Sequence, residues 1–265
     1  MRKILILLTA AALSMSCSEQ FNAAYLLSGG AKVAQAAALS DSQIQSYVSQ
    51  YIQKLDAENT VLPESSAYVK RVRKMTSGIT SANGTALNFK VYKTSDVNAF
   101  ACADGSVRIY SGLLDVMTDD EVLGVVGHEI GHVALKHSKK QFKQALLTSA
   151  VRDAIVSAGG TVAVLTSSQL GDIGESLMSA SFSRKQETAA DDFGYEFLKG
   201  AGKNPWAMAM AFEVLQNLSN SDTASGTQAA SGSVGQLFST HPATADRISR
   251  MAQRATSDGY KKPSK

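Results

Sequence analysis

The stretch Gly127 to His137 reads G-H-E-I-G-H-V-A-L-K-H and holds three of the four histidines in the chain. His128 and His132 are four residues apart, so on an α-helix their imidazoles share one face and can bind one metal ion. Neutral imidazole suits zinc, and a catalytic zinc site has three protein ligands and a fourth position for water. Glu129 lies about 100° from His128 around the helix, where a carboxylate can take the proton from a water that attacks a carbonyl group.

His137, the third histidine of this stretch, is not predicted to be a ligand. It lies roughly 140° from His132 around the helix, away from the ligand face. We expect it in the C-terminal turn of the same helix, where the helix dipole favours a protonated histidine.

The third metal ligand must come from another part of the chain, and the sequence offers two candidates, His241 and Glu187. Glu187 and Asp191 are four apart in the stretch FSRKQETAADDFGYEFL (182–198), so they share one face of a second predicted helix. If Glu187 binds the metal, Asp191 is free to accept a hydrogen bond from the far nitrogen of a zinc-binding histidine, which fixes its tautomer. Two acidic residues on a helix are usually only solvated, so this pair indicates a metal site only in combination with the histidine pair on the first predicted helix.

The helix that carries His128 is predicted to begin at Thr118. Thr118 and Glu121 form a capping box, with the threonine at the N-cap and the glutamate three residues later. The buried face of the helix is marked by Val122, Val125, Val126, Ile130 and Val133. The metal-binding pair is therefore expected on a capped, amphipathic helix.

A small β-sheet is predicted before that helix. Residues 86–94 and 98–111 alternate in polarity and are rich in Val, Ile, Tyr and Phe, with Asp104-Gly105 as a hairpin turn. This segment contains the predicted strand residues Asn98 to Ala101.

The rest of the chain is predicted to be mainly helical. Residues 39–76 are expected to start a helix at Ser40 or Asp41 and to break at Pro63. Residues 141–180 are apolar, but the charges of Arg152 and Asp153 favour packed helices over a transmembrane span. Further helices are expected over 182–199, over 206–217 and after His241-Pro242, with a flexible low-complexity loop at 219–233 and a disordered tail at 259–265. The pattern predicts one mostly helical α+β domain over residues 40–258.

Residues 1–16 have the basic, apolar and small-residue regions of a secretory signal peptide. Cys17 follows directly, where bacterial lipoprotein precursors carry the cysteine that becomes lipidated, although Leu13 stands four residues before it instead of the usual three. We predict lipidation at Cys17 and a tether over residues 17–39, since a multiply acylated cysteine anchors firmly. The alternative is a plain secreted protein with an incidental cysteine.

The charge of the mature chain is nearly balanced. Removal of the signal peptide leaves 24 basic and 23 acidic residues, so charge gives no reason to expect nucleic acid as a partner. The basic run from Lys70 to Lys74 is expected to be a solvated helix face. With Cys17 lipidated, Cys102 has no disulfide partner and is expected to be a small buried residue, with a redox role as the alternative.

These residues resemble the zinc metallopeptidase family of the CAAX prenyl protease, HtpX and OMA type. The resemblance is carried by His128-Glu129-Ile130-Gly131-His132 and by Glu187-Thr188-Ala189-Ala190-Asp191. Three further pieces agree, and these are Asn98 to Ala101 followed by Tyr110 to Leu114, Ser181 to Arg184, and Thr240-His241-Pro242 with Arg247. The match extends over about residues 40 to 255, and the chain resembles in particular the lipidated periplasmic proteases of the LoiP type.

The resemblance implies a gluzincin-like fold and a site with one zinc ion. The implied zinc ligands are His128, His132 and Glu187, with Glu129 as the general base and Asp191 hydrogen-bonded behind a ligand histidine. It also implies that Asn98, Ala99, Phe100 and Ala101 form an exposed edge strand beside the site, to which a substrate adds as a further strand. An ordinary hairpin strand is the alternative for this segment.

Two residues near the C-terminus of the predicted domain, His241 and Arg247, also have candidate roles. His241 has three readings: it stabilises the oxyanion formed in peptide hydrolysis, it occupies the fourth zinc position and keeps the enzyme latent, or it caps the last helix. Arg247 is expected to brace a nearby Asp or Glu rather than to contact substrate.

The resulting hypothesis is a zinc endopeptidase, lipid-anchored in the periplasm of a Gram-negative bacterium, that cuts misfolded or unprotected envelope proteins. Ser18 after the cysteine favours the outer membrane, and other quality-control proteins are conceivable partners. One alternative is a chaperone-like lipoprotein that binds extended polypeptides with little turnover, although an intact Glu129 argues against a pure binder. A zinc hydrolase of a non-peptide substrate is a further alternative, which no feature of the sequence supports.

Overall fold

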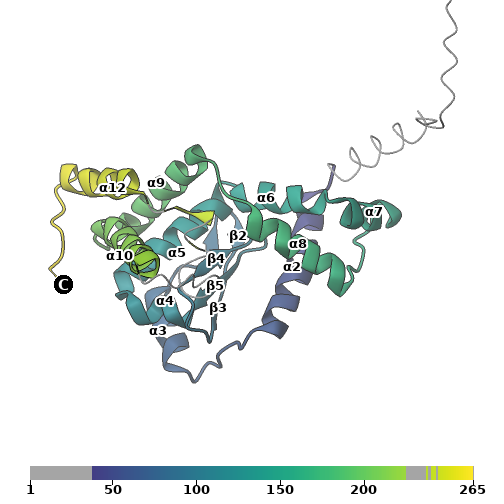
Figure 1. Ribbon diagram of the computed structural model, residues 1–265, viewed down its shortest axis with the longest axis horizontal. Coiled ribbons are helices and arrows are strands. Elements are labelled where there is room, and N and C mark those ends of the chain that lie inside the picture. The colour runs from purple at the N-terminus through teal and green to yellow at the C-terminus, as the bar shows by residue number, and fades with distance from the viewer. Residues whose placement is uncertain (1–37, 225–236, 238–239, 243, 265) are drawn as a thin grey trace, which may run out of the picture.

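Figure 1 shows the computed structural model of the chain, which describes residues 38–224, 237, 240–242 and 244–264. The helices are α2 (Asp41–Glu58), α3 (Ala67–Met75), α4 (Ser111–Val116), α5 (Asp119–Ala134), α6 (His137–Leu146), α7 (Ser149–Ser157), α8 (Ser167–Ser179), α9 (Arg184–Gly200), α10 (Trp206–Ala224) and α12 (Ala245–Ser257). The strands are β1 (Ser81–Ala82), β2 (Thr85–Ala86), β3 (Asn88–Tyr92), β4 (Ala99–Ala101) and β5 (Ser106–Tyr110). The prediction of a mostly helical α+β domain with a small sheet is confirmed.

The main sheet has three strands in the order β3-β5-β4. β4 and β5 are antiparallel and form the hairpin expected at Asp104-Gly105, while β3 is parallel to β5. Gly105 has a φ of 87°, and a Cβ there would lie 1.8 Å from the carbonyl oxygen of Ala86, so only glycine fits this turn. β4 pairs with β5 alone among the described residues, which makes it an edge strand.

The buried apolar residues form two clusters, which lie on opposite sides of the molecule in Figure 1. The first cluster joins the sheet to α3, α4, α5, α9, α10 and α12. The second cluster joins α2 to α6, α7 and α8, which come from the alanine-rich segment 141–180. That segment folds as packed helices, as predicted, and no helix in the described part of the chain is long and apolar enough to cross a membrane.

One buried ion pair connects α2 of the second cluster to the sheet of the first. Asp56 on α2 accepts hydrogen bonds from Arg108 on β5 at 2.8 and 3.1 Å and from Tyr92 on β3 at 2.6 Å. The side chain of Arg108 is only 2% exposed, and Lys90 adds a further contact to Asp56 at 2.7 Å. Because a buried guanidinium needs a charged or polar partner, the contact of Arg108 with Asp56 links α2 to the sheet.

Three expectations about chain organisation are wrong. The helix of His128 ends at Ala134, and Lys136 adopts a left-handed conformation with φ 62°, so His137 starts α6. The helix α10 runs on to Ala224 and takes in the first residues of the expected loop at 219–233. The expected disordered tail is ordered in its described residues 259–264, where the carbonyl oxygen of Tyr260 accepts a hydrogen bond from Trp206.

The other N-terminal and loop predictions fall outside the described residues. These are the signal peptide at 1–16, the lipidated Cys17, the tether up to residue 37, the loop at 225–233 and residue 265. In the described part, Ser40 caps α2 as expected, with a capping box to Gln43.

Candidate active site

The helix α5 begins as the sequence predicts. The Thr118 side chain accepts from the Glu121 amide, and the Glu121 side chain accepts from the Thr118 amide. The helix lies in the interior of the molecule, with His128, Glu129 and His132 all no more than 3% exposed. Three ionisable side chains on one buried helix need polar partners, because an unpaired buried charge is costly.

Those partners come from α9, which packs closely against α5. A Cβ at Gly131 on α5 would lie 3.1 Å from the carbonyl oxygen of Ala190, and a Cβ at Gly194 on α9 would lie 3.0 Å from the backbone nitrogen of His128. The two glycines let the helix backbones approach each other. This approach brings Glu187 on the first turn of α9 to the ligand face of α5.

Four side chains converge at this point. Atom Nε2 of His128 lies 3.1 Å from Nε2 of His132, and Oε1 of Glu187 lies 3.3 Å from Nε2 of His132. Atom Nδ1 of His241 lies 3.1 Å from Nε2 of His128 and 2.9 Å from Oε1 of Glu187. One donor atom from each of the four lies within 4.8 Å of the others, so together they can surround one metal ion.

The spacing of these donors fits zinc. In a tetrahedral site with metal–ligand bonds of about 2.0–2.1 Å, neighbouring ligand atoms lie roughly 3.3–3.4 Å apart. The separations among the donors of His128, His132 and Glu187 run from 3.1 to 3.5 Å. Two imidazoles and a carboxylate are also a ligand set typical of catalytic zinc.

Behind the donors, His128 has a charged partner. Its Nδ1 lies 2.9 Å from Oδ1 of Asp191, which is fully buried. Asp191 in turn accepts hydrogen bonds from Arg247 on α12 at 2.6 and 2.9 Å, so the expectation that Arg247 braces an acidic residue is confirmed. Arg247 also lies 2.8 Å from Oε2 of Glu187, and it therefore supports two acids of the site at once.

His132 has a partner of a different kind, which the sequence reasoning missed. Its Nδ1 lies 3.2 Å from Nδ1 of His137, the first residue of α6. The ring of Phe182 also stacks on His132, with centroids 3.8 Å apart. The expectation that His137 belongs to the C-terminal turn of α5 fails because the chain turns at Lys136. The only available sequence signal was the proximity of a third histidine.

The pKa shifts of His132 and Glu187 favour the forms of these side chains that bind a metal. Burial lowers the pKa of His132 strongly, which favours the neutral imidazole that a metal needs. Burial alone would raise the pKa of Glu187, but hydrogen bonds from His132 and His241 outweigh it and keep that pKa well below its usual range. Asp191 follows the same pattern, since the partners His128 and Arg247 lower its pKa to about 2 against the effect of burial.

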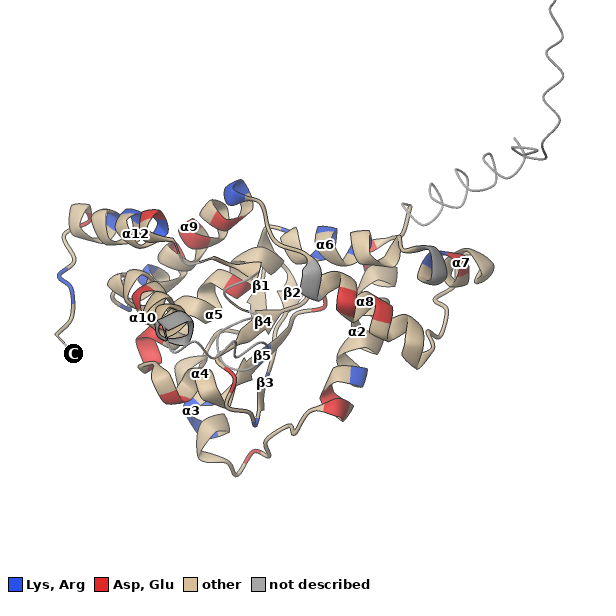
Figure 2. Cartoon of the chain, viewed as in Figure 1, with Lys and Arg blue, Asp and Glu red and all other residues tan. Residues whose placement is uncertain are grey.

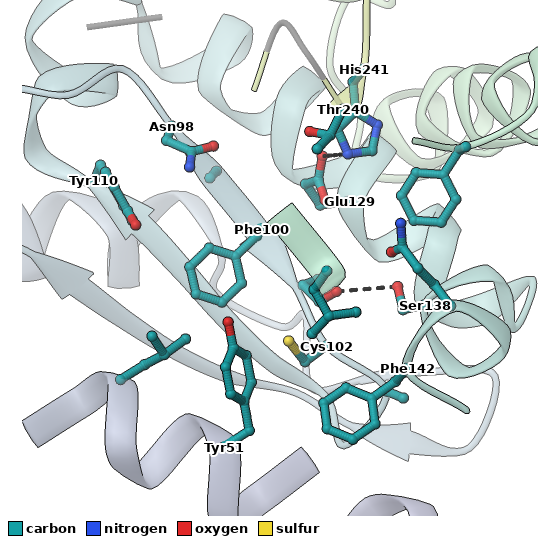
Figure 3. A pocket seen from close by; sticks show the side chains of 17 residues that line it. Tyr51, Asn98, Phe100, Cys102, Tyr110, Glu129, Ser138, Phe142, Thr240 and His241 are labelled. Carbon is teal, nitrogen blue, oxygen red and sulfur yellow. Dashed lines mark hydrogen bonds and ion pairs between the residues drawn. The ribbon is translucent and has the colours of Figure 1, made fainter. Parts of the chain in front are cut away.

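A cavity of about 310 Å³ adjoins the donors (Figure 3). Glu129 and His241 lie at one end, and Tyr51 and Phe142 lie at the other. Asn98 and the β4 residues Ala99 to Ala101 line the cavity between them, so β4 flanks the site. The apolar lining beyond β4 comes from the second cluster, on α2 and α6.

Two further predicted residues are placed by the structure. Cys102 lines the same cavity, but burial raises the pKa of its thiol, which disfavours the reactive thiolate that a redox role needs. His241 does not cap the last helix, because the N-cap of α12 is Thr244. Atom Nε2 of His241 lies 3.6 Å from Oε1 of Glu129, so His241 is close both to the other three donors and to the predicted base.

This fold and site define a metallopeptidase, with a histidine pair and a glutamate on two packed helices beside an edge strand. Sequence comparison identifies the family: peptidase family M48 matches residues 63–255, and the chain belongs to it. As a member of this family, the chain is a zinc-dependent metalloendopeptidase.

Two curated relatives match this chain over almost their whole length. The chain is 41% identical to the metalloprotease LoiP of Escherichia coli (strain K12) over 98% of this chain and 99% of LoiP. It is 38% identical to the metalloprotease YcaL of the same organism over 96% and 97% of the two chains. A putative beta-barrel assembly-enhancing protease of Vibrio cholerae is 29% identical over 67% of this chain and 37% of that protein.

Proposed function

We propose that the chain binds one zinc ion through His128, His132 and Glu187 and hydrolyses peptide bonds with Glu129 as the general base. The observation that carries the proposal is the position of Glu129. Its carboxylate is 3% exposed, it is next to the donor group along α5, and it also lines the cavity. A bound zinc would polarise the substrate carbonyl and activate water.

The remaining site residues would orient these groups. Asp191, held by Arg247, would accept a hydrogen bond from Nδ1 of His128 and so direct Nε2 toward the metal. His137 would do the same for His132 from the opposite side. Each ligand histidine then has one fixed tautomer, which is the usual function of such outer contacts.

The substrate is proposed to be an extended polypeptide. Asn98 to Ala101 would pair with the substrate backbone, because β4 is an edge strand that lines the cavity. The apolar end of the cavity, between Tyr51 and Phe142, would take a large apolar side chain. Such side chains are exposed in misfolded proteins, which supports a function in protein quality control.

The location is proposed to be the periplasmic side of a bacterial membrane, through a lipid at Cys17. The sequence of the N-terminus supports a signal peptide followed by a lipidated cysteine, and Ser18 favours the outer membrane. The relative named as a putative beta-barrel assembly-enhancing protease supports a task at the envelope and other envelope proteins as partners.

The test is casein cleavage by the full chain and by Glu129→Gln, with the zinc content of both measured. The parent should cleave and the variant should lose about 10²–10⁴-fold in rate, since proton transfer by a positioned side chain contributes that much. Both should hold one zinc per chain, because Glu129 is not a ligand. Zinc in both but equal cleavage rates would contradict the assignment of the base.

A latent or chaperone-like protein is the second candidate, and the position of His241 favours it. Its Nδ1 is as close to the donors as the donors are to one another, so it could fill the fourth zinc position and exclude water. The alternative role, oxyanion stabilisation, uses the same position. His241→Ala separates the two: a rise in cleavage indicates latency, and a loss with zinc retained indicates a catalytic role.

A further inference from the structure

Five lysines surround a depression on the surface where α6 and α9 begin. They are Lys136, Lys139, Lys140, Lys143 and Lys185, and we call them the lysine surface. The depression is completed by Leu135, His137, Ser183 and Gln186, so none of the residues that line it is acidic. Lys136, Lys140 and Lys185 are exposed, and Figure 2 shows basic residues along α6.

The lysine surface keeps most of its charge unneutralised. Lys139 pairs with Asp41, and the other four lysines form no ion pair with any described residue. The basic run on α3 is different, because Arg71 pairs with Asp119 and Arg73 pairs with Glu64. Two of the four basic residues on α3 are therefore paired with acids, compared with one of the three on α6.

The arrangement of α6 separates this charge from the cavity. Its three lysines lie within an arc of roughly 100° on an ideal helix, and Ser138 and Phe142 lie outside that arc. Ser138 and Phe142 line the cavity, so a partner on the lysine surface would leave that wall of the cavity uncovered.

The described chain also begins beside the lysine surface, as the contact of Lys139 with Asp41 near the start of α2 shows. Residues 17 to 38 can span at most about 80 Å, so a lipid at Cys17 alone would not fix the orientation of the domain. A tether also raises the effective concentration of the domain at the membrane, so even a weak charged contact becomes populated.

We propose that the lysine surface binds the anionic phospholipid headgroups of the membrane and orients the protease on it. The proposal rests on the lipid anchor of the proposed function. Clustered lysines are attracted to anionic lipid, and the attraction adds up over several residues within the screening length of salt. The bound orientation keeps α6 against the membrane and the cavity accessible to polypeptides.

The test is lysine footprinting of the full lipidated chain in vesicles, with an amine-reactive reagent and mass spectrometry. In vesicles of phosphatidylcholine with phosphatidylglycerol, labelling of Lys140 and Lys185 should fall roughly fivefold compared with phosphatidylcholine alone. Labelling of Lys70 and Lys74 on α3 should be the same in both. High salt should abolish the protection of Lys140 and Lys185. The triple variant Lys136→Gln/Lys140→Gln/Lys143→Gln should also lose the protection, which is measured in that variant as the labelling of Lys185.

Equal labelling of Lys140 in the two vesicle types would overturn the proposal. So would protection in solution by an acidic peptide without protection by anionic vesicles, since the partner would then be a polypeptide. Flotation with phosphatidylcholine vesicles at high salt measures the anchor separately. If the chain does not float with phosphatidylcholine vesicles at high salt but its lysines are protected by anionic vesicles at low salt, the result would contradict the lipid anchor and support membrane binding by the lysine surface.

Discussion

The two apolar clusters differ in what they surround. The first cluster encloses ionisable groups that are paired with one another, as in the chain of contacts from His128 through Asp191 to Arg247. The second cluster encloses apolar and aromatic side chains, and the lysines of α6 lie outside it. The comparison indicates a division of tasks, in which one half holds the chemistry and the other half provides a wall for the substrate and a surface for a membrane.

The catalytic cavity lies where the two halves meet. Ala99 and Ala101 of β4 belong to the first cluster, while Phe100 packs against the second cluster, which contains Tyr51 and Phe142. The shape of the cavity therefore depends on how the halves are held together, and the pair of Asp56 and Arg108 is a buried polar link between them.

The largest effect on stability is expected from Asp56→Asn. The substitution leaves the guanidinium of Arg108, which is 2% exposed, without its carboxylate, and breaking a buried ion pair costs about 3–5 kcal/mol. Urea unfolding should show this loss. The control is Lys54→Gln on the same helix, which removes a pair with the half-exposed Glu58 and should change the free energy of unfolding by less than about 1 kcal/mol. Equal effects would mean that Asp56 does not link the halves.

Two phenylalanines, one in each half, sharpen the comparison. Phe142 and Phe212 are 2% and 4% exposed, so Phe142→Ala and Phe212→Ala should each lower stability by about 3 kcal/mol. Of the two, only Phe212 lies beside the metal-binding side chains, with its ring 6.2 Å from that of His128 and under the guanidinium of Arg247. Chelator competition should therefore detect weaker zinc binding in Phe212→Ala alone. Weaker zinc binding in Phe142→Ala would contradict the division of tasks.

The site was largely predictable from the sequence because its signals are local. The capping box of Thr118 and Glu121 fixed the start of α5, and helical periodicity placed His128 and His132 on one face. The pair of Glu187 and Asp191 had the same spacing on α9. These signals work because each depends only on the geometry of one helix.

The parts that were wrong depend on contacts between distant segments or on one backbone turn. His137 was assigned to α5 because the helical periodicity of the sequence does not reveal that Lys136 adopts a left-handed conformation and ends the helix path. The polar stretch after Asn217 continues α10, since adding a turn to an existing helix needs no new nucleus. The tail is ordered by Trp206, which is more than fifty residues away in the sequence.

His137 offers a test of whether contacts behind the zinc ligands orient them. If His137 accepts a hydrogen bond from Nδ1 of His132, His137→Leu should weaken zinc binding about 10–100-fold. His137→Asn should restore much of the affinity, because the amide oxygen can take the place of the imidazole nitrogen. Zinc affinity from chelator competition distinguishes this role from general packing. Equal affinities of the Leu and Asn variants would indicate that His137 only fills space beside Phe182.

The smallest expected effect is the pH dependence of the link between the halves. Burial alone would raise the pKa of Asp56, but hydrogen bonds from Arg108 and Lys90 outweigh it and lower the pKa to about 2 from 3.8. A carboxyl with a lowered folded-state pKa contributes stability that is present above its unfolded pKa and lost as the pH falls through the folded pKa.

The pH-dependent part of the contribution of Asp56 should therefore be lost between about pH 4 and pH 2 and amount to roughly 1–2 kcal/mol after allowance for solvent screening. Urea unfolding of the zinc-free parent and of Asp56→Asn checks this, because other acids titrate equally in both proteins. The difference between the two free energies of unfolding should be constant above about pH 5 and shrink below pH 4. A difference that stays constant through this range would mean that the carboxylate of Asp56 is not what holds α2 to the sheet.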